Sequence, residues 1–378
     1  MFCVGTALYK GDRIMQTGII GLPASGKSTV FYALTGGQTR AKRVAPNEPN
    51  VAVVKVPDHR LWDLAEIFKP RRVVPADVEY LDFPPVARAF GKSEGIGGKF
   101  LADVSKCDAL VHVVRAFVNE SVPHLDGSVD PLRDATTMDM ELMFSDLALL
   151  ERRLERVRDS ISKVKLQERE AVERERDILS RIKEQLEKEI PIRAQSLNEE
   201  ERKTIRNYRF LTEKPLLVLM NIGEDQLPRA VEIEQSFRVR YAQTHTAIAA
   251  ICGQLEMELA ELDESERPQF LHDLGIPEPG LNRVIRICYE LLGLISFFTV
   301  GEDEVKAWTI KRGTPAVEAA GVIHTDIQRG FIRAEVTPYH DFMRYKNFAD
   351  ARKHGVVRLE GKNYVVQDGD ICHFLFNI

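Results

Sequence analysis

Cysteine is scarce in this chain, and long apolar runs are absent. The cysteines are scattered and no two form a C-x-x-C pair, which excludes a zinc ribbon and a disulfide framework and is typical of a reducing cytosol. They are Cys3, Cys107, Cys252, Cys288 and Cys372. No stretch approaches the roughly 18–20 apolar residues of a membrane-spanning helix. The longest, from Tyr289 to Val300, is typical of buried core. We therefore expect no membrane partner.

The N-terminal residues lack the pattern of a secretory signal, in which a basic region precedes an apolar one. We therefore expect a cytoplasmic protein. Residues 1–16 form an extension with no recognisable element, and either Met1 or Met15 could be the first residue translated.

The excess of charge of one sign is also small. Lys and Arg number 52 against 57 Asp and Glu, a net charge of −5. This balance excludes a protein that coats naked nucleic acid by bulk electrostatics, and it leaves room for a local basic patch. At about 150 residues per domain, a chain of 378 residues has room for two to three globular domains. The composition carries no strong sign of an obligate oligomer.

What the chain does contain is an alternation of apolar strands and helices. Residues 17–35 have the pattern of a strand, a glycine-bearing turn and a helix. Further strand-like runs lie at Val51–Val56, Val78–Phe83, Ala109–Val114 and Leu216–Met220. The sequence therefore predicts an α/β fold with a doubly wound sheet, assigned to residues 17–140 and 210–280.

Between these two parts, residues 141–209 carry 33 charged side chains in 69 positions. Apolar residues recur there at the 3-4 spacing of a coiled-coil seam, in two stripes separated by a charged stretch. They are Leu147, Leu150, Leu154, Val157, Ile161 and Val164, then Leu179, Ile182, Leu186 and Ile190. The pattern predicts an inserted antiparallel helical hairpin, which serves either as a structural arm or as a lever that docks a partner.

Residues 293–378 change character again, after a helix expected at Leu281–Leu294. Short β-rich segments occur at Phe331–Val336, Val356–Leu359, Tyr364–Val366 and Ile371–Phe376. This part carries 11 basic and 11 acidic residues, so it is not an obvious polyanion-binding surface. We interpret it as a small α+β module.

The strongest motif lies at the start of the α/β part. Gly21-Leu22-Pro23-Ala24-Ser25-Gly26-Lys27-Ser28, followed by Thr29, matches the phosphate-binding pattern G-x-x-x-x-G-K-[ST]. The glycines let backbone N–H groups approach a phosphate, the lysine neutralises its oxygens, and the serine hydroxyl can ligate Mg²⁺. The expected place of the motif between a strand and a helix favours a phosphate site over a turn that has no binding role.

A magnesium–nucleotide site also requires an acid at the end of a neighbouring strand. Asp82 ends the run Val78–Phe83 and is our candidate, together with Ser28, for holding Mg²⁺. The alternative is that Asp82 only caps the strand.

Taken together, the motifs resemble those of the YchF-type Obg-like ATPases, a branch of the translation-factor-related P-loop GTPases. The resemblance covers the chain from about Thr17 to Ile378, through many blocks in the same order and spacing. They include GIIGLPASGKST, EPN (Glu48–Asn50), SEGIGGKFL (Ser93–Leu101), HVVRAF (His112–Phe117), EPGLNRVIR (Glu278–Arg286), AAGVIHTDIQRGFIRAEV (Ala319–Val336) and DGDICHFLFNI (Asp368–Ile378).

The resemblance implies a Ras-like P-loop domain, an inserted coiled-coil hairpin and a C-terminal TGS domain of β-grasp fold. It also implies binding and hydrolysis of ATP in preference to GTP, with Mg²⁺, and association with ribosomes or translation. A TGS-like sheet could contact RNA or dock a protein, and a purely structural core explains the same residues.

Base selection can be argued from the residues that correspond to the guanine-reading N-K-x-D. Here the strand end reads Asn221-Ile222-Gly223-Glu224, similar to the family's N-x-x-E. Without the aspartate, selection of the guanine N1–H and N2–H weakens, while Asn221 can still pair with a purine N6/N7 edge. We therefore expect a preference for ATP, with Ala249–Gly253, including Cys252, supplying backbone near the base.

Three positions depart from the family pattern. Ala24 replaces the P-loop asparagine that can help to hold a monovalent cation, which puts potassium stimulation in doubt. Pro46 and Pro85 replace a threonine and a glycine of the two switches, and proline has no N–H to sense a γ-phosphate. Either flanking residues compensate, or the chain is a divergent member with weaker hydrolysis.

For catalysis, Lys27 and His112 are the candidates. The usual glutamine is absent, with Val86 in its neighbourhood, and His112 of HVVR could orient the attacking water or be a packed core residue. Two function classes follow: a slowly hydrolysing ATPase that works with the ribosome, or a non-catalytic binding module gated by nucleotide. The two prolines favour the second, whereas Lys27, Ser28, Asp82 and His112 favour the first.

Overall fold

The computed structural model describes residues 15–37, 49–83, 96–124, 126–161, 165–241 and 246–377. The chain divides into two compact units. We call Gln16–Ala52 with Glu79–Leu291 the P-loop unit, and Val53–Val78 with Leu292–Ile378 the C-terminal unit.

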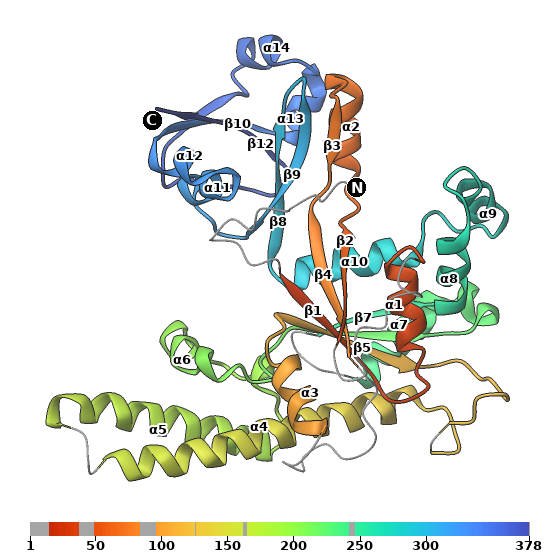
Figure 1. Ribbon diagram of the computed structural model, residues 1–378, viewed down its shortest axis with the longest axis vertical. Helices are drawn as coiled ribbons and strands as arrows, with labels where there is room; N and C mark the ends of the chain where they lie inside the picture. Colours follow the sequence, from red (N-terminus) through yellow and green to blue (C-terminus); the bar gives the residue numbers. More distant parts are fainter. Residues whose placement is uncertain are drawn as a thin grey trace, which may run out of the picture. The chain divides into compact units, whose positions relative to one another are not determined.

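The P-loop unit is built on a six-stranded sheet with the order β2-β4-β1-β5-β6-β7 (Figure 1). The strands are β1 (Gln16–Ile20), β2 (Asn50–Lys55), β4 (Asp77–Asp82), β5 (Ala109–Arg115), β6 (Leu216–Asn221) and β7 (Thr246–Ile251). β1 pairs in parallel with β4 and β5, and the parallel ladder continues through β6 to β7. β5 and β6 are buried along their whole length, as expected for central parallel strands. The predicted doubly wound α/β sheet is confirmed.

Helices cover this sheet and frame its carboxyl-terminal edge. They are α1 (Lys27–Leu34), α3 (Ile96–Val104), α7 (Ala230–Arg240), η4 (Glu224–Arg229), α8 (Gly253–Glu261), α9 (Arg267–Asp273) and α10 (Gly280–Leu291). One core cluster joins Ile20, Leu110 and Val218 of the strands to helices that include α3, α4 and α7. α10 contacts β5, β6 and β7, and it buries Val284, Ile285 and Cys288.

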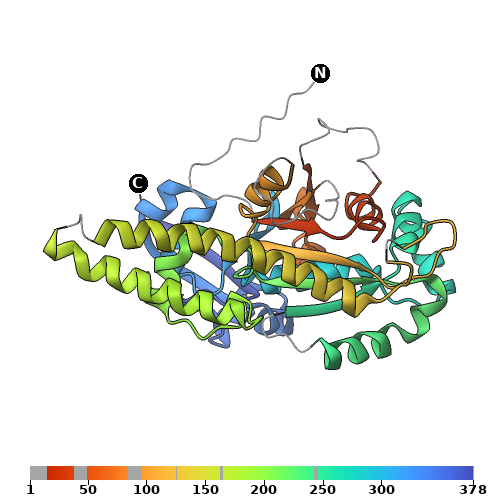
Figure 2. The same ribbon diagram turned by 90° about the horizontal axis from the view of Figure 1, so that it is seen from below.

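The helical hairpin is a continuation of one of these covering helices. α4 (Pro131–Ile161) is a single helix of 31 residues, and α5 (Leu166–Glu187) returns beside it (Figure 2). Met138 and Leu142, near the start of α4, belong to the core under the sheet. Leu150 and Leu154, further along, pack with α5. The predicted boundary at residue 141 therefore falls inside α4, because the same helix serves both the sheet and the hairpin.

Most residues of the two predicted stripes line the hairpin core, whereas Ile161 and Ile190, both half-buried, lie outside it. Leu150, Leu154, Val157, Leu179, Ile182 and Leu186 are buried in one cluster, against which Leu147 also packs. Val164 lies outside the described residues. After α5, the short η2 (Ile192–Ala194), α6 (Glu199–Ile205) and η3 (Arg206–Tyr208) lead back to β6.

The C-terminal unit has its own six-stranded sheet, in the order β11-β10-β12-β8-β9-β3 (Figure 1). The strands are β3 (Arg72–Val74), β8 (Leu294–Val300), β9 (Glu304–Lys311), β10 (Phe331–Pro338), β11 (Arg358–Glu360) and β12 (Asp370–Phe376). One face packs on α11 (Ala316–Ile323) and α12 (Thr325–Arg329) through a core that includes Phe297, Ala319 and Phe374. The remaining helices are α2 (His59–Phe68), α13 (Tyr339–Tyr345) and α14 (Phe348–Lys353).

The assignment of all residues 17–140 to the nucleotide-binding domain needs a correction at Val53–Val78. This stretch belongs to the C-terminal unit. β3 pairs in parallel with β9, and Phe68 stacks on Phe342 with ring centroids 5.6 Å apart. Arg60 donates to Asp368 at 2.8 Å. Strand pairing and aromatic packing with residues more than 200 positions away therefore decide where this stretch lies.

A second correction concerns Tyr364–Val366, which forms no strand. Val365 makes only an isolated bridge with Pro315. The Tyr364 carbonyl accepts from Ala316 N–H at 2.7 Å, and Val366 N–H donates to the Thr314 carbonyl at 3.1 Å. Its backbone groups are thus satisfied by the chain around the start of α11, so no ladder forms.

Candidate functional site

The phosphate-binding loop lies between β1 and α1, as its motif predicts. Gly26 has φ +87°, and a Cβ at this position would lie 2.0 Å from Asn221 Nδ2. A Cβ on Gly21 would lie 2.7 Å from the Val113 carbonyl oxygen. Both clearances are below any real Cβ contact, so glycine is required at each position by close packing and, at Gly26, also by backbone conformation.

Ala24, by contrast, occupies a conformation that glycine or asparagine adopts more readily. Its φ is +63°, in the left-handed region, and its side chain is exposed. Asparagine is several-fold enriched there because its side chain can bond locally. The alanine that replaces the family's asparagine is therefore held with backbone strain.

Lys27 and Asp82, which lie 55 positions apart in the sequence, meet at this loop. The Lys27 ammonium contacts an Asp82 carboxylate oxygen and the Phe83 carbonyl, and both side chains are buried. Asn50 Nδ2 lies 3.5 Å from the other Asp82 oxygen. The buried cation and acid neutralise each other, and a bound phosphate would replace Asp82 as the partner of the Lys27 ammonium.

The oxygen donors beside this pair suit a hard divalent cation. The Ser28 hydroxyl is on the first turn of α1 and exposed, with Thr29 next to it half-buried. Hydroxyl and carboxylate oxygens are the protein ligands that Mg²⁺ takes alongside phosphate oxygens. Ser28 and Asp82 thus fit a magnesium–phosphate group by the chemistry of their donors.

Asn221 is the residue that holds the loops of the site together. Its Nδ2 donates to the Ser25 carbonyl at 3.0 Å, and its Oδ1 accepts from Gly253 N–H at 2.9 Å. Asn221 is 4% exposed. One amide therefore bridges the phosphate-binding loop and the start of α8. The same NH₂ group has a second N–H, the donor that a purine N7 can use.

The two other predicted base contacts flank this bridge. Glu224 begins η4 and is exposed. Cys252 precedes α8 and is buried, and burial raises the pKa of its thiol, with Glu224 among the charges that act in the same direction. The Cys252 side chain is therefore an uncharged thiol near Glu224.

His112 is placed in the interior of β5. It pairs with Ile20 of β1 and Val218 of β6 in parallel ladders, and both partners belong to the core that α4 covers. Paired residues of neighbouring strands point to one face of a sheet, so the imidazole faces the α4 side. Burial, with the nearby Arg193 charge, lowers the pKa of His112 to about 3. His112 is therefore neutral at pH 7. This placement supports the packed alternative, and its role in catalysis stays a prediction.

Sequence reasoning missed the residues that shape the connection after β5. Arg115 is 2% exposed, and it donates to the Val122 carbonyl at 2.7 Å and stacks 4.6 Å from the Phe117 ring centroid. The Phe117 ring edge lies 3.9 Å from the Cβ position of Gly26. Both residues lie within the HVVRAF block, so an arginine at the end of a buried strand and an aromatic two residues later were the available signal.

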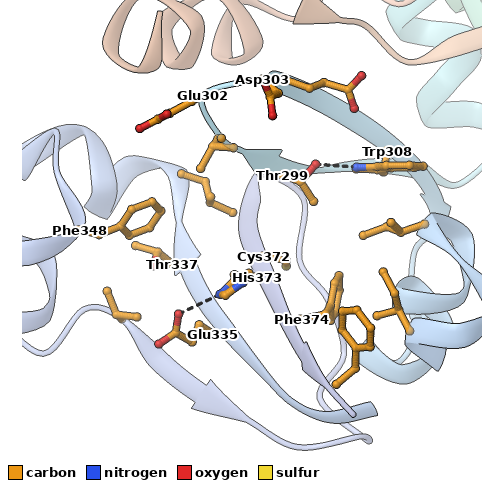
Figure 3. A pocket seen from close by; sticks show the side chains of 18 of the residues that line it. Thr299, Glu302, Asp303, Trp308, Glu335, Thr337, Phe348, Cys372, His373 and Phe374 are labelled. Atoms are coloured by element: carbon orange, nitrogen blue, oxygen red, sulfur yellow. Dashed lines mark hydrogen bonds and ion pairs between the residues drawn. The ribbon is translucent and has the colours of Figure 1, made fainter. Parts of the chain in front are cut away.

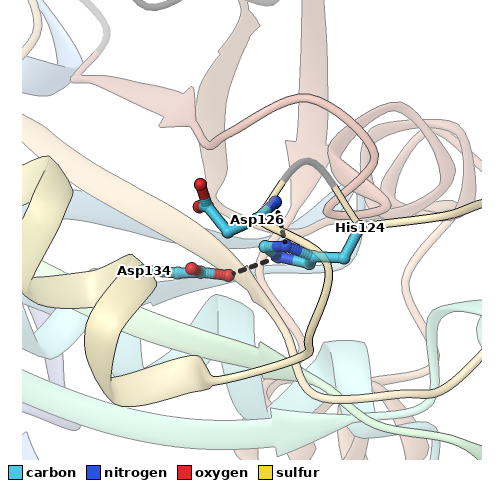
Figure 4. Close-up of side chains that lie close together, drawn as sticks. All are labelled: His124, Asp126 and Asp134. Atoms are coloured by element: carbon cyan, nitrogen blue, oxygen red, sulfur yellow. Dashed lines mark hydrogen bonds and ion pairs between the residues drawn. The ribbon is translucent and has the colours of Figure 1, made fainter.

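A histidine of this connection, His124, is oriented by an acid (Figure 4). Its Nε2 bonds Asp134 Oδ2 at 2.8 Å, and Asp126 N–H donates to its Nδ1 at 3.1 Å. His124, Asp126 and Asp134 could hold a metal by their spacing. Arg133, however, donates to Asp134 at 2.9 Å, so a guanidinium already supplies the positive charge beside that carboxylate.

The switch positions Pro46, Pro85 and Val86 lie outside the described residues. Among the helices that the structure describes, none is long and apolar enough to cross a membrane.

Comparisons with known proteins agree with this architecture. A profile described as 50S ribosome-binding GTPase (MMR_HSR1) matches residues 16–146. The YchF-GTPase_C profile, described as a protein of unknown function, matches residues 294–377.

Relatives match over nearly the whole chain. One from Bacillus subtilis (strain 168), named Ribosome-binding ATPase YchF, is 42% identical over 368 residues, covering 96% of this chain and 100% of the relative. Another of that name, from Escherichia coli O157:H7, is 41% identical over 365 residues, 96% of this chain and 99% of its own. The solved structure of the Schizosaccharomyces pombe YchF GTPase superposes with a TM-score of 0.84 at 32% identity, over 96% of this chain and 98% of that one. The chain therefore belongs to the YchF family of P-loop NTPases.

Proposed function

We propose that this protein is a cytoplasmic, ribosome-associated P-loop ATPase that binds ATP with Mg²⁺ in preference to GTP and hydrolyses it slowly. The observation that carries the proposal is the phosphate-binding loop, with buried Lys27 paired to Asp82 at its base. The names of the relatives, Ribosome-binding ATPase YchF, support the ATP and ribosome parts.

Phosphate binding is the first step that these residues account for. The backbone N–H groups of the loop and the N-terminal end of α1 attract the phosphate oxygens. Lys27 exchanges its contact with Asp82 for the β- and γ-phosphate oxygens, which frees the Asp82 carboxylate. Ser28 and Asp82 would hold Mg²⁺, which supplies positive charge that neutralises the phosphate oxygens.

Base selection would rest on Asn221 and Glu224. The second N–H of Asn221 can donate to N7, an acceptor that adenine and guanine share, so this contact binds a purine without choosing between them. Selection against guanine would come from the replacement of the aspartate of N-K-x-D by Glu224, which holds the same position three residues after Asn221. The Glu224 side chain is one methylene longer than aspartate and is exposed.

Hydrolysis requires a group that orients water. His112 is our sequence-based candidate for this role. Burial lowers its pKa to about 3, so His112 is neutral at pH 7 but a weak base, and its proposed role is to position the attacking water by a hydrogen bond rather than to take its proton.

The alternative is a nucleotide-gated binding module without turnover. Pro46 and Pro85 favour it, since neither offers an N–H to a γ-phosphate. The hairpin and the C-terminal unit would then recognise a partner, and the nucleotide would stabilise one arrangement. RNA contact through the TGS-like sheet is a further part of this proposal.

Phosphate release with ATP and with GTP, in the presence and absence of ribosomes, tests the proposal. We expect slow release from ATP that Lys27→Ala abolishes, while Lys106→Ala, at an exposed lysine after α3, keeps the wild-type rate. Tight GTP and weak ATP binding would contradict the ATP preference. ATP binding without any release would favour the non-catalytic module.

A further inference from the structure

The C-terminal sheet opens at one point along its length, where β8 and β12 separate. The two strands are joined at Ser296 and Gly369, by a hydrogen bond of 2.8 Å, and at the pair Phe298–Ile371. Beyond this pair, and among the strands that the structure describes, β8 continues to Val300 with β9 as its one partner. Likewise, β12 continues to Phe376 with β10 as its one described partner.

A cavity of about 620 Å³ lies at this opening. Thr299 and Val300 line it from β8, and residues Ile371–Phe374 with Phe376 line it from β12. Figure 3 shows the open space between the β8–β9 turn and the strand that carries His373. We call this space the β8–β12 slot. Among the described strands, none pairs with β12 on this side after Ile371.

We propose that the β8–β12 slot binds an extended peptide segment of a partner protein, which pairs with β12 as an added strand and alternates apolar with basic side chains. A free strand edge offers main-chain donors and acceptors that only another extended backbone satisfies as a ladder. The edge from Cys372 to Phe376 spans about 17 Å at roughly 3.3 Å per residue, room for a strand of about five residues.

The side chains around the slot explain why the bound peptide should alternate apolar and basic side chains. On one face, Phe374 lies with Trp308 and Ile327 in or against the core that α11 and α12 cover. On the other face, His373 Nδ1 lies 3.2 Å from the cross-strand Glu335, whose other neighbour is Arg352. Successive side chains of an added strand point to opposite faces. One set would therefore meet apolar and aromatic surface, and the other a carboxylate.

The charges of the lining favour a basic segment. Its side chains carry four carboxylates, Glu302, Asp303, Glu304 and Glu335, against one arginine, Arg352, and His373. Arg72 pairs with Glu304, whereas Asp303 meets Arg71 in a pair whose side chains are 85% and 86% exposed. Such an exposed pair is easily exchanged for a lysine or arginine of the peptide. The same carboxylates repel the phosphates of RNA, so the slot is unsuited to nucleic acid.

The test uses the full-length protein and a fluorescein-labelled octapeptide of alternating Lys and Val. We expect saturable binding, with amide protons of Cys372–Phe376 protected from hydrogen exchange. An octapeptide with alternate backbone amides N-methylated keeps every side chain and loses main-chain donors. It should bind more than about tenfold more weakly, because each lost hydrogen bond costs about 0.5–1.5 kcal/mol.

Charge variants supply the second arm. Glu302→Gln with Asp303→Asn should weaken binding of the Lys-Val peptide by roughly three- to tenfold. The control pair Glu318→Gln and Glu360→Gln, at residues that do not line the slot, should leave it unchanged. Equal affinity for the methylated and unmethylated peptides would overturn the proposal. So would protection outside Cys372–Phe376, or tighter binding of an octauridine RNA that competes for the slot.

Discussion

Removing the Asn221 amide should weaken the P-loop unit and its nucleotide site together. Asn221→Ala leaves the Ser25 carbonyl and the Gly253 N–H, now bonded at 3.0 and 2.9 Å, without partners in a buried place. A buried polar group that loses its partner costs about 1–3 kcal/mol, so the two together should cost roughly 2–6 kcal/mol of stability. For a unit of this size, that lowers the melting temperature by roughly 4–24 °C.

The assay is thermal unfolding without nucleotide, paired with titration of a fluorescent ATP analogue. We expect ATP affinity to fall as well, because the phosphate-binding loop loses its tie to α8 and its conformation becomes one of several. Asn207→Ala, at an exposed asparagine of η3, is the control and should melt as wild type does.

A third variant tests whether the position requires the length of the asparagine side chain as well as its amide group. Asn221→Gln keeps the amide but lengthens the side chain by one methylene. The space beside Gly26 is already full, because a Cβ built on Gly26 would lie only 2.0 Å from the Asn221 amide nitrogen. Asn221→Gln should therefore also destabilise the unit. If Asn221→Ala melts within about 1 °C of wild type, the amide does not bridge the two loops and the reasoning fails.

Three other outcomes test the remaining features. Ala24→Asn should raise the melting temperature by roughly 1–3 °C, because asparagine tolerates φ +63° better than alanine. A lower melting temperature would contradict the backbone strain at Ala24. Potassium-stimulated turnover in this variant would indicate that the asparagine supplies the cation contact that the alanine lacks. The pKa of His112 is lowered to about 3 in the folded state and lies near 6.5 in the unfolded state, so the unfolded state takes up a proton first as the pH falls. The free energy of unfolding therefore keeps its full value above pH 6.5 and decreases below it, by up to about 2 kcal/mol at pH 5. His112→Asn should flatten that part of the pH dependence of unfolding, and an unchanged slope would speak against it. Leu150→Ala, at a fully buried hairpin position, should cost about 2–4 kcal/mol in thermal or proteolytic unfolding, whereas Phe144→Ala, at a side chain that is 58% exposed on the same helix, should cost less than about 0.5 kcal/mol.

Local patterns were enough for the elements whose signal is contiguous. The phosphate-binding loop could be read from the sequence because its glycines and lysine act through backbone next to them. The hairpin stripes could be read because helical periodicity repeats over many turns, and Leu150, Leu154 and Leu186 are all buried as expected.

Boundaries were harder, since they depend on what a helix packs against. The charge density of residues 141–209 marked the exposed arm of α4, while the same helix begins at Pro131 with a face that covers the sheet. No change in helical periodicity marks the transition. The strand expected at Tyr364–Val366 failed for a similar reason, because its backbone bonds go to the chain beside α11.

Sequence motifs and periodicity were sufficient to identify an α/β P-loop NTPase of the YchF family, with a helical hairpin and a C-terminal sheet. The folded structure was needed to show that Val53–Val78 belongs to the C-terminal unit and adds β3 to its sheet, that Asn221 bridges two loops, and that none of the described strands pairs with β12 beyond Ile371 on the β8 side. These features arise from hydrogen bonds and packing between residues far apart in the chain. Such contacts depend on which backbone groups remain unpaired after folding, and no local run of residues records that.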